Sequence, residues 1–250
     1  MLEEQHFPRV SVVIPTRNEG QNLHYILPRI PPIVGEVILV DGHSTDDTIA
    51  IARQLLPAIH IIEQVGRGKG DAVRLGLTAC SGDIIVLLDG DGSTDPLEIP
   101  CFVDALLAGH DFAKGSRFIK GGGSQDITPM RYLGNFCLCR LVNVLFRERF
   151  SDLCYGYNAF WRYCLAYMEI DCSGFEVETQ ISLRMCKANL KIVEVPSVEH
   201  PRVYGQSNLR TFRDGWRVLK TIMKERSTTV SQTDLLKAQF NMPEHSLIHD

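Results

Sequence analysis

Short apolar runs rich in β-branched residues alternate with segments of helical spacing through the first half of the chain. The apolar runs cover residues 10–15, 36–41, 60–64, 83–89 and 112–116. Apolar residues three or four positions apart predict helices over residues 18–30, 45–56, 69–80 and 96–108. Unbroken apolar strands separated by helices are typical of a parallel sheet that is covered on both faces. The pattern therefore predicts an α/β, Rossmann-like fold with a mostly parallel, doubly wound sheet.

The second half of the chain changes character. It opens with a glycine-rich segment at residues 120–128, which predicts a flexible loop. Further helices are expected over residues 129–146, 174–190 and 213–226. A strand at 191–198 and a polar loop at 202–209 separate the last two of these helices. We expect these elements to form an α+β extension beside the sheet, followed by a tail or swapped arm at 227–250.

The composition and net charge of the chain indicate which kinds of partner it binds and in which cellular compartment it occurs. The 250 residues carry a formal net charge of −4, so no general positive field attracts nucleic acid. The eight cysteines form no CxxC pair and lack histidines at zinc spacing, which predicts free thiols in a reducing compartment. The sequence shows neither the apolar core of a signal peptide nor a run of ~18 apolar residues long enough to span a membrane. We therefore expect a cytoplasmic protein that binds no nucleic acid.

Polar side chains and glycines follow each of the five apolar runs. In an open parallel sheet, ligands bind at the carboxyl ends of the strands, where these residues are expected to converge. The candidates for ligand contact are Pro15, Thr16, Arg17 and Glu19 after the first run, Asp41 after the second, Lys69 and Gly70 after the third, Asp89, Gly90 and Asp91 after the fourth, and Arg117 after the fifth.

Asp89 and Asp91 carry the most specific chemistry among these candidates. Two carboxylates separated by one residue, directly after a buried strand, can share one cation. Hard oxygen ligands suit Mg²⁺ or Mn²⁺, which complete their coordination with water and phosphate oxygens. Gly90 between them allows a ligand to approach the backbone. The sequence therefore predicts a divalent metal site at Asp89 and Asp91.

The glycine-rich stretch at residues 66–70 predicts a phosphate-binding loop of neither common type. A Walker loop needs Ser or Thr after the lysine, but Gly70 follows Lys69. A dinucleotide fingerprint follows the first strand, whereas these glycines follow the third. Backbone N–H groups at the start of the next helix remain suited to hold a diphosphate.

Four motifs connect the sequence to a known family: VSVVIPTRNEG, VILVDGHSTDDT, GRGKGDAVRLG and LLDGDGSTDP, in that order. Together they resemble the family 2 glycosyltransferases of the GT-A fold. GSRF, PMRYLGN and RVYGQSN extend the resemblance, which covers about residues 9–225. They are similar in particular to the branch of polyprenyl-phosphate sugar synthases, which includes dolichol-phosphate mannose synthase.

The resemblance implies that residues 1–117 bind a UDP- or GDP-linked sugar. Pro15, Arg17, Glu19 and Asp41 would line the pocket for base and ribose. Asp89 and Asp91 would hold Mg²⁺ or Mn²⁺ against the diphosphate, where the metal neutralises the leaving group. The diphosphate would also meet Lys69 from the glycine-rich loop, Arg202 as a lid and Ser207. Gly42 stands where the family usually has a second aspartate, so the donor base and sugar stay open.

The resemblance further implies that residues 118–226 form the acceptor half of the same catalytic domain. Arg117 and Arg131 would bind the phosphate of a polyprenyl monophosphate through bidentate hydrogen bonds, with help from Asn135. Such a phosphate is already anionic, so its attack on the anomeric carbon needs no general base. Single displacement, as in this family, would invert the anomeric centre. The helix at 129–149 would then lie at a bilayer surface or pack on the catalytic core.

Three other functions are weighed against this one. A soluble hydroxyl acceptor would need a general base, for which Asp152, Glu176 and Glu178 are the candidates. A non-catalytic nucleotide-sugar-binding protein is the more remote alternative, because the Asp89–Asp91 pair is intact. A nucleotidyltransferase is disfavoured, since no glycine-rich loop follows the first strand. The oligomeric state is left open.

Overall fold

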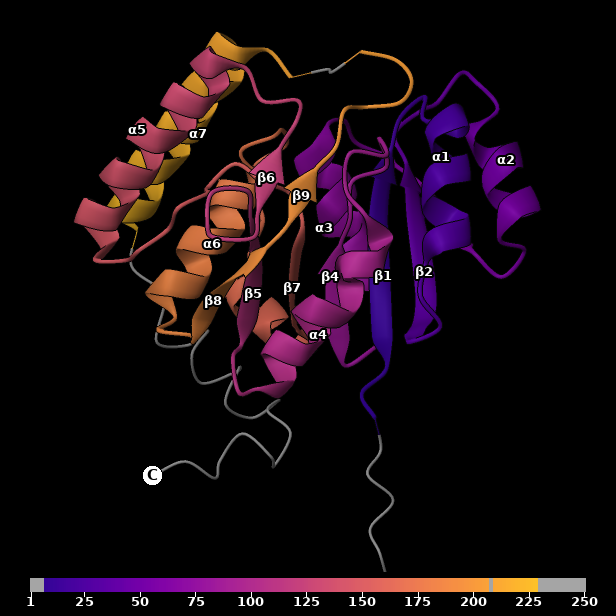
Figure 1. Ribbon diagram of the computed structural model, residues 1–250, viewed down its shortest axis with the longest axis horizontal. Coiled ribbons are helices and arrows are strands. Elements are labelled where there is room, and N and C mark those ends of the chain that lie inside the picture. Colours follow the sequence, from indigo (N-terminus) through magenta and orange to yellow (C-terminus); the bar gives the residue numbers. More distant parts are fainter. Residues whose placement is uncertain (1–6, 207–208, 229–250) are drawn as a thin grey trace, which may run out of the picture.

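A seven-stranded mixed sheet forms the centre of the computed structural model, which describes residues 7–206 and 209–228 (Figure 1). Its strand order is β3-β2-β1-β4-β7-β5-β8. The strands are β1 (Val10–Thr16), β2 (Val34–Asp41), β3 (His60–Glu63), β4 (Ile84–Leu87), β5 (Phe112–Ser116), β7 (Asn158–Trp161) and β8 (Ile192–Pro196). All five strands expected in the first half are present. They put the polar residues that follow them at one edge of the sheet.

Strand β7 was not predicted, and it changes the topology. It runs antiparallel between β4 and β5, with Ala159 opposite both Val86 and Ala113. Its sequence, NAFW, is four residues long and has neither a long apolar run nor an alternating pattern. The strand is recognisable only from its two buried neighbours, which supply its hydrogen bonds.

Helices cover both faces of the sheet, as the sequence predicts. Helices α1 (Gly20–Ile26), α2 (Thr48–Leu55) and α4 (Ile99–Leu107) pack on one face, around residues such as Leu39 and Val86. Helices α3 (Lys69–Ala79) and α6 (Val177–Lys187) and the 3₁₀ segment η3 (Arg162–Tyr167) pack on the other. Because successive strand residues point to opposite faces, the buried strands supply apolar side chains to both cores.

Several helix boundaries differ from the sequence prediction. The α-helical part of the segment expected at 18–30 ends at Ile26, and a 3₁₀ turn, η1 (Leu27–Arg29), follows because Pro28 cannot continue the helix. The helix expected from residue 96 begins with the 3₁₀ turn η2 (Pro96–Glu98). There Asp95 accepts a hydrogen bond from the Leu97 N–H at 2.9 Å, as a helix-capping residue does.

A second, two-stranded sheet corrects the prediction of a flexible loop at 120–128. Strand β6 (Gly123–Ser124) pairs in parallel with β9 (Val198–Glu199). The strand expected at 191–198 is therefore divided: β8 ends at Pro196, and β9 leaves the main sheet to join β6. The Ser124 hydroxyl donates a hydrogen bond to Glu199, which ties the two short strands together.

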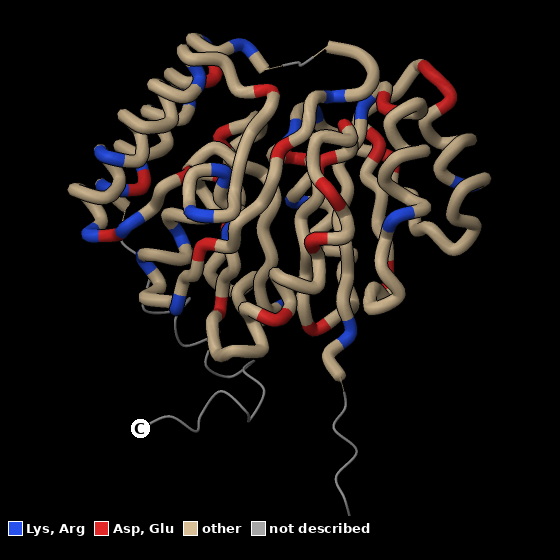
Figure 2. The backbone as a smooth tube through the Cα atoms, in the orientation of Figure 1, with Lys and Arg blue, Asp and Glu red and all other residues tan. Residues whose placement is uncertain are grey.

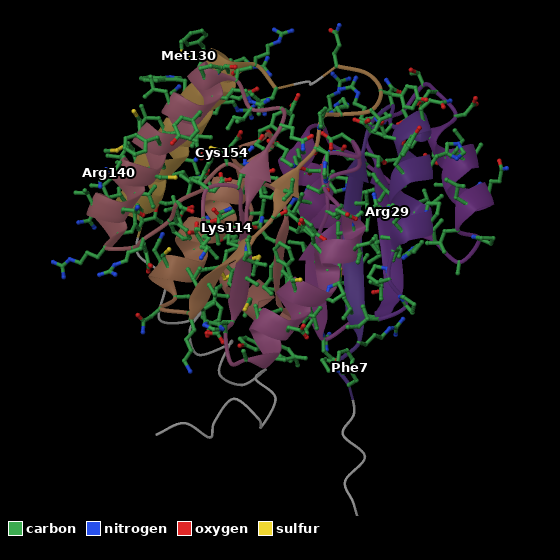
Figure 3. All side chains as sticks on the ribbon, viewed as in Figure 1. Phe7, Arg29, Lys114, Met130, Arg140 and Cys154 are labelled. Atoms are coloured by element: carbon green, nitrogen blue, oxygen red, sulfur yellow. The ribbon has the colours of Figure 1, made fainter. Side chains whose placement is uncertain are left out.

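Helices α5 (Pro129–Phe146) and α7 (Thr211–Ser227) lie side by side as an outer layer beyond α6 (Figure 1). Their inner faces share a small core with α6, built from Cys139, Val142, Leu183, Val218 and Ile222. Figure 3 shows Met130 and Arg140 along the outer side of α5, where both are exposed. No helix among the described residues has the length and apolar character needed to cross a membrane. Of the tail expected at 227–250, Ser227 belongs to α7 and residues 229–250 lie outside the described residues.

Candidate active site

A cavity of about 910 Å³ opens at the carboxyl ends of the parallel strands and extends to α5 and α7. Acidic and basic positions gather at this edge of the sheet, at the top of Figure 2. Most of the site residues expected from the sequence line the cavity. They are Pro15, Arg17, Glu19, Lys69, Asp89, Gly90, Asp91, Arg117, Arg131 and Arg202. The structure therefore brings together side chains up to 187 positions apart, from Pro15 to Arg202.

Three other candidates lie outside the cavity lining. Thr16 is buried and donates a hydrogen bond to the Val40 carbonyl at 3.4 Å. Asp41 is also buried; its Oδ2 accepts a hydrogen bond from the Ser44 N–H, while its Oδ1 has no hydrogen-bond partner in the described part of the chain. The Gly70 N–H donates to the Ser173 carbonyl at 3.1 Å, so this group is already used within the protein. Ser207 lies outside the described residues.

Lys69 joins one of the two strand-end aspartates to a carboxylate from α6. Its Nζ lies 2.5 Å from Asp89 Oδ1 and 2.5 Å from Glu178 Oε1. Burial by itself would lower the pKa of Lys69, but the attraction of Asp89 and Glu178 outweighs burial and raises that pKa above its ordinary value. The ammonium therefore stays charged over the whole physiological pH range.

Arg202 makes the equivalent connection for the second aspartate. Its Nη2 lies 2.9 Å from Asp91 Oδ2, and its Nη1 lies 2.8 Å from Glu19 Oε1. Burial opposes the charge of Arg202, yet Asp91 and Glu19 raise its pKa overall. Burial also raises the pKa of Glu19, although Arg202 offsets part of this effect. The polar loop before α7 is therefore tied down onto the end of β1.

The residues at the strand end fit a divalent metal that is held jointly with a ligand. Asp89 and Asp91 both line the cavity, and Ser93 orients Asp91 by donating to its Oδ1 from both N–H and Oγ. Within the described part of the chain, no three His, Cys, Asp or Glu side chains group closely enough to form a metal site by themselves. Two carboxylates completed by phosphate oxygens are a common arrangement for Mg²⁺.

Two glycines permit close contacts around these carboxylates: Gly90 packs against β1, and Gly156 leaves space for Asp89. A Cβ on Gly90 would come within 2.5 Å of Thr16 Cγ2, and one on Gly156 within 2.7 Å of Asp89 Oδ2. The Gly156 Cβ would also approach Lys69 Nζ to 2.9 Å. Sequence reasoning missed Gly156, because its role depends on contact with residues far away in the chain. A side chain there would displace the Asp89–Lys69 pair.

Arg117 is enclosed by two carboxylates at the floor of the cavity. Its Nε and Nη2 donate to Asp152 at 2.7 and 3.0 Å, and its Nη1 contacts both oxygens of Glu199 at 3.0 Å. Asp152 is completely buried and does not line the cavity, so its predicted role as a general base does not fit its position. Glu199, which the sequence analysis did not select, stands at the cavity instead.

The far end of the cavity is lined by arginines from α5 and α7. Arg131 lies in the first turn of α5, 3.6 Å from Asp126. Arg210, Arg213 and Arg217 line the same end from the start of α7, where the sequence analysis predicted a helix but selected no site residue. Arg217 lies 3.0 Å from Glu176, and this ion pair engages the second of the three candidate general bases. Asn135 supports the loop below, accepting hydrogen bonds from the N–H groups of Leu153 and Cys154.

The sheet order and the position of the cavity define the GT-A class of α/β fold. The family model "Glycosyl transferase family 2" matches residues 11–167, more than half of the chain. The chain therefore belongs to glycosyl transferase family 2, and it is a glycosyltransferase. The resemblance suggested by the motifs is confirmed.

Two curated relatives support this family assignment. Glycosyltransferase AglJ of Haloferax volcanii is 29% identical over 224 residues, which are 88% of this chain and 72% of that protein. Dolichol-phosphate mannosyltransferase of Pyrococcus furiosus is 31% identical over 212 residues, covering 81% of this chain. The chain spans only 59% of the length of the Pyrococcus protein.

A solved structure supports the fold independently. Glucosyl-3-phosphoglycerate synthase from Mycobacterium tuberculosis, in complex with Mn²⁺, uridine diphosphate and phosphoglyceric acid, superimposes with a TM-score of 0.70. The match covers 90% of this chain and 80% of the mycobacterial one at 23% identity. At that identity the likeness establishes the architecture of the sheet and its flanking helices.

Proposed function

We propose that this chain is an inverting, metal-dependent glycosyltransferase that moves a hexose from a UDP- or GDP-linked sugar to a polyprenyl monophosphate. One observation carries the choice of acceptor: each described carboxylate that lines the cavity lies within ion-pair distance of a lysine or arginine. The pairs involve Glu19, Asp89, Asp91, Glu178, Glu199 and Asp214. A neighbouring cation lowers the basicity of a carboxylate, and an anionic acceptor needs no general base.

The donor would bind at the ends of β1 and β4, in residues 1–117. Pro15, Arg17 and Glu19 line this part of the cavity and would contact the base and ribose. Asp41 lies just below, and its unpartnered Oδ1 offers an acceptor to a ribose hydroxyl after a small side-chain movement. A metal held by Asp89 and Asp91 would supply Lewis-acid stabilisation of the leaving diphosphate.

The acceptor phosphate would bind where residues 118–226 line the cavity. Among the described residues, Asp126 is the one ion-pair partner of Arg131, at 3.6 Å, so its guanidinium is well suited to form charge-assisted bonds with a phosphate. Arg117 would be the second contact, and it would share its hydrogens between the phosphate, Asp152 and Glu199. The phosphate oxygen then attacks the anomeric carbon directly, with inversion of configuration.

The relatives favour the lipid phosphate over a soluble hydroxyl acceptor. The Pyrococcus relative is named as a dolichol-phosphate mannosyltransferase. A further relative from Mycolicibacterium smegmatis, 29% identical over 214 residues, is named as a polyprenol monophosphomannose synthase. A soluble acceptor would need one of the three candidate bases, and Asp152, Glu176 and Glu178 are each buried or held by a cation. A non-catalytic role would leave the Asp89–Asp91 arrangement without a purpose.

A lipid acceptor also gives a role to the outer faces of α5 and α7, which we propose as a peripheral contact with the cytoplasmic face of a membrane. These faces expose large apolar side chains: Met130, Tyr132, Leu133, Phe136, Val144, Phe212, Trp216 and Met223. Apolar groups flanked by arginine and lysine are typical of helices that lie in a bilayer interface. Trp216→Ser should weaken binding to anionic vesicles about tenfold, whereas Leu107→Ser on α4 should not. Equal vesicle binding by both variants would contradict the contact.

The test of the proposed function is a transfer assay that follows label into lipid. The protein is mixed with polyprenyl monophosphate, Mg²⁺ or Mn²⁺, and separately labelled GDP-mannose, UDP-glucose and UDP-N-acetylglucosamine. We expect label from one donor in the organic phase, and its loss when a chelator removes the metal. Metal-dependent donor hydrolysis without lipid label would overturn the acceptor assignment and direct the search to soluble acceptors.

A further inference from the structure

Each of the two aspartates assigned to the metal shares one cation with an outer carboxylate. Lys69 lies between Asp89 and Glu178, with both contacts at 2.5 Å. Arg202 lies between Asp91 and Glu19, with contacts of 2.9 and 2.8 Å. The two bridges come from different parts of the chain, α3 and the loop before α7, yet they have the same acid–base–acid order.

The two ion-pair bridges are largely shielded from solvent, so water screens their charges only weakly. The side chains of Lys69 and Arg202 are only 16% and 17% exposed, and those of Asp89 and Asp91 are 25% and 23% exposed. A divalent cation that approaches the aspartates alone therefore competes with a tethered ammonium and a tethered guanidinium at short range. The competition weakens binding of the metal by itself.

The outer carboxylates remain as ion-pair partners of Lys69 and Arg202 when these two cations leave the aspartates. Glu178 and Glu19 are 5% and 8% exposed, and each holds one side of its bridge. When a diphosphate enters, Lys69 and Arg202 gain a second anion to replace Asp89 and Asp91. Without Glu178 and Glu19, the same movement would leave a partly buried charge unpaired, which is costly.

We propose that Lys69 and Arg202 occupy the metal-binding carboxylates until the donor diphosphate arrives, so that metal and nucleotide bind cooperatively. Glu178 and Glu19 act as positioning residues that retain the two cations during this exchange. The inference rests on the proposed function for the identity of the metal and donor sites. It adds that the protein itself, besides direct chelation by the diphosphate, couples the two binding events.

The experiment measures Mn²⁺ binding, which does not require turnover. Free Mn²⁺ is followed by electron paramagnetic resonance in titrations of the full chain, with and without saturating UDP or GDP. Three proteins are compared: wild type, Arg202→Gln and Arg213→Gln. The control variant loses the same charge from the same cavity, but its partner, Asp214, is not an assigned metal ligand.

We expect Arg202→Gln to bind Mn²⁺ alone about tenfold more tightly than wild type, because Asp91 is released. The factor by which the nucleotide tightens Mn²⁺ binding should fall by about the same amount, since the coupling is reciprocal. Arg202→Lys, which keeps the charge, should restore part of the coupling. Arg213→Gln should bind Mn²⁺ as tightly as wild type does, and the nucleotide should tighten its Mn²⁺ binding by the same factor.

Three results would overturn the inference, and they separate it from the proposed function. If wild type and Arg202→Gln show the same nucleotide-dependent gain in Mn²⁺ affinity, Arg202 does not compete with the metal, while the donor site itself stands. If wild type binds no Mn²⁺ even with UDP or GDP present, the metal site and the inference both fail. A tenfold gain shared by Arg213→Gln would show a general charge effect and would also overturn it.

Discussion

The two ends of the cavity differ in how tightly their charges are paired. At the end formed by β1 and β4, four carboxylates form ion pairs with Lys69 and Arg202, with contacts of 2.5 to 2.9 Å. At the end formed by α5 and α7, four arginines face Asp126, Glu176 and Asp214, with contacts of 3.0 to 3.6 Å. The first end therefore holds closely paired carboxylates where a metal would bind, and the second holds loosely paired guanidinium groups for an anion. One cavity thus combines the two environments that the proposed donor and acceptor phosphates would require.

The largest expected effect concerns Arg117, which lies between the two ends. Arg117→Met should lower the free energy of unfolding by about 3–5 kcal/mol, because Asp152 and Glu199 remain buried without their cation. Urea unfolding measures this loss. Arg29→Met is the matched control: its pair with Asp95 is also 2.7 Å long, but Arg29 is 47% exposed, so less than about 1 kcal/mol should be lost. Similar losses in both variants would contradict the prediction that burial makes the ion pairs of Arg117 more important for stability than that of Arg29.

Asp91→Asn tests the acid-rich end. It keeps the shape of the side chain but removes one charge expected to hold the metal, so the transfer rate should fall about 10²- to 10³-fold. The measurement is label transfer at saturating donor and Mn²⁺, with circular dichroism to verify folding. Asp104→Asn, on the exposed side of α4, should retain full activity. Undiminished transfer by Asp91→Asn would remove this aspartate from the metal site.

Arg131→Ala tests the arginine-rich end. Losing a charge-assisted bond to phosphate should reduce transfer about 10- to 100-fold, while the affinity for UDP or GDP stays within about twofold. Acceptor-dependent kinetics and calorimetric nucleotide binding separate the two effects. Arg53→Ala on α2 provides a control, since Arg53 is exposed and far from the cavity lining. Loss of donor affinity in Arg131→Ala would mean that the two ends are not functionally separate.

A half-buried lysine and a buried one extend the comparison. Lys69 is held by two carboxylates, whereas among the described residues Lys114 on β5 donates hydrogen bonds only to the Tyr155 carbonyl and Asn158 Oδ1, at 3.2 and 3.4 Å (Figure 3). Burial lowers the pKa of Lys114, and more distant carboxylates such as Asp152 only partly offset it.

The lowered pKa gives Lys114→Met a pH-dependent effect on stability. At pH values between the lowered pKa of Lys114 in the fold and about 10.4, Lys114 is protonated in the unfolded chain but not in the folded one. Lys114 therefore destabilises the fold at lower pH, and this destabilisation disappears as the pH rises. The stability of Lys114→Met relative to wild type should therefore decrease from pH 7 to 10.5. The change is about 1.4 kcal/mol for each unit by which the pKa is lowered. A pH-independent difference in urea unfolding would contradict the assigned shift.

The acid-rich end was largely predictable from the sequence because its residues directly follow apolar strands. Because β1, β2 and β4 are neighbouring parallel strands, Glu19, Asp89 and Asp91 lie at one edge of the sheet, however their side chains are arranged. The hydrogen bond from the Gly70 N–H to the Ser173 carbonyl was not predictable, because it joins distant segments of the chain.

The acceptor side was less predictable because its contacts link distant elements. Arg117 pairs with Asp152 and Glu199, which lie 35 and 82 positions away, and no local motif marks either carboxylate. Strand β7 is defined by its neighbours and not by its four residues. Sequence patterns therefore predicted which strand-end residues come together at the cavity, but the ion pairs of Arg117 required the structure.

The most direct test of the account compares two acceptors that differ only in the phosphate. Polyprenyl monophosphate and the free polyprenol of the same length are each incubated with the productive labelled donor, metal and protein. An enzyme that uses an already ionised acceptor and has no free carboxylate base should label the monophosphate and leave the alcohol unlabelled. Labelling of the alcohol, or of a soluble sugar in place of the monophosphate, would contradict the proposed acceptor and require a general base in the cavity.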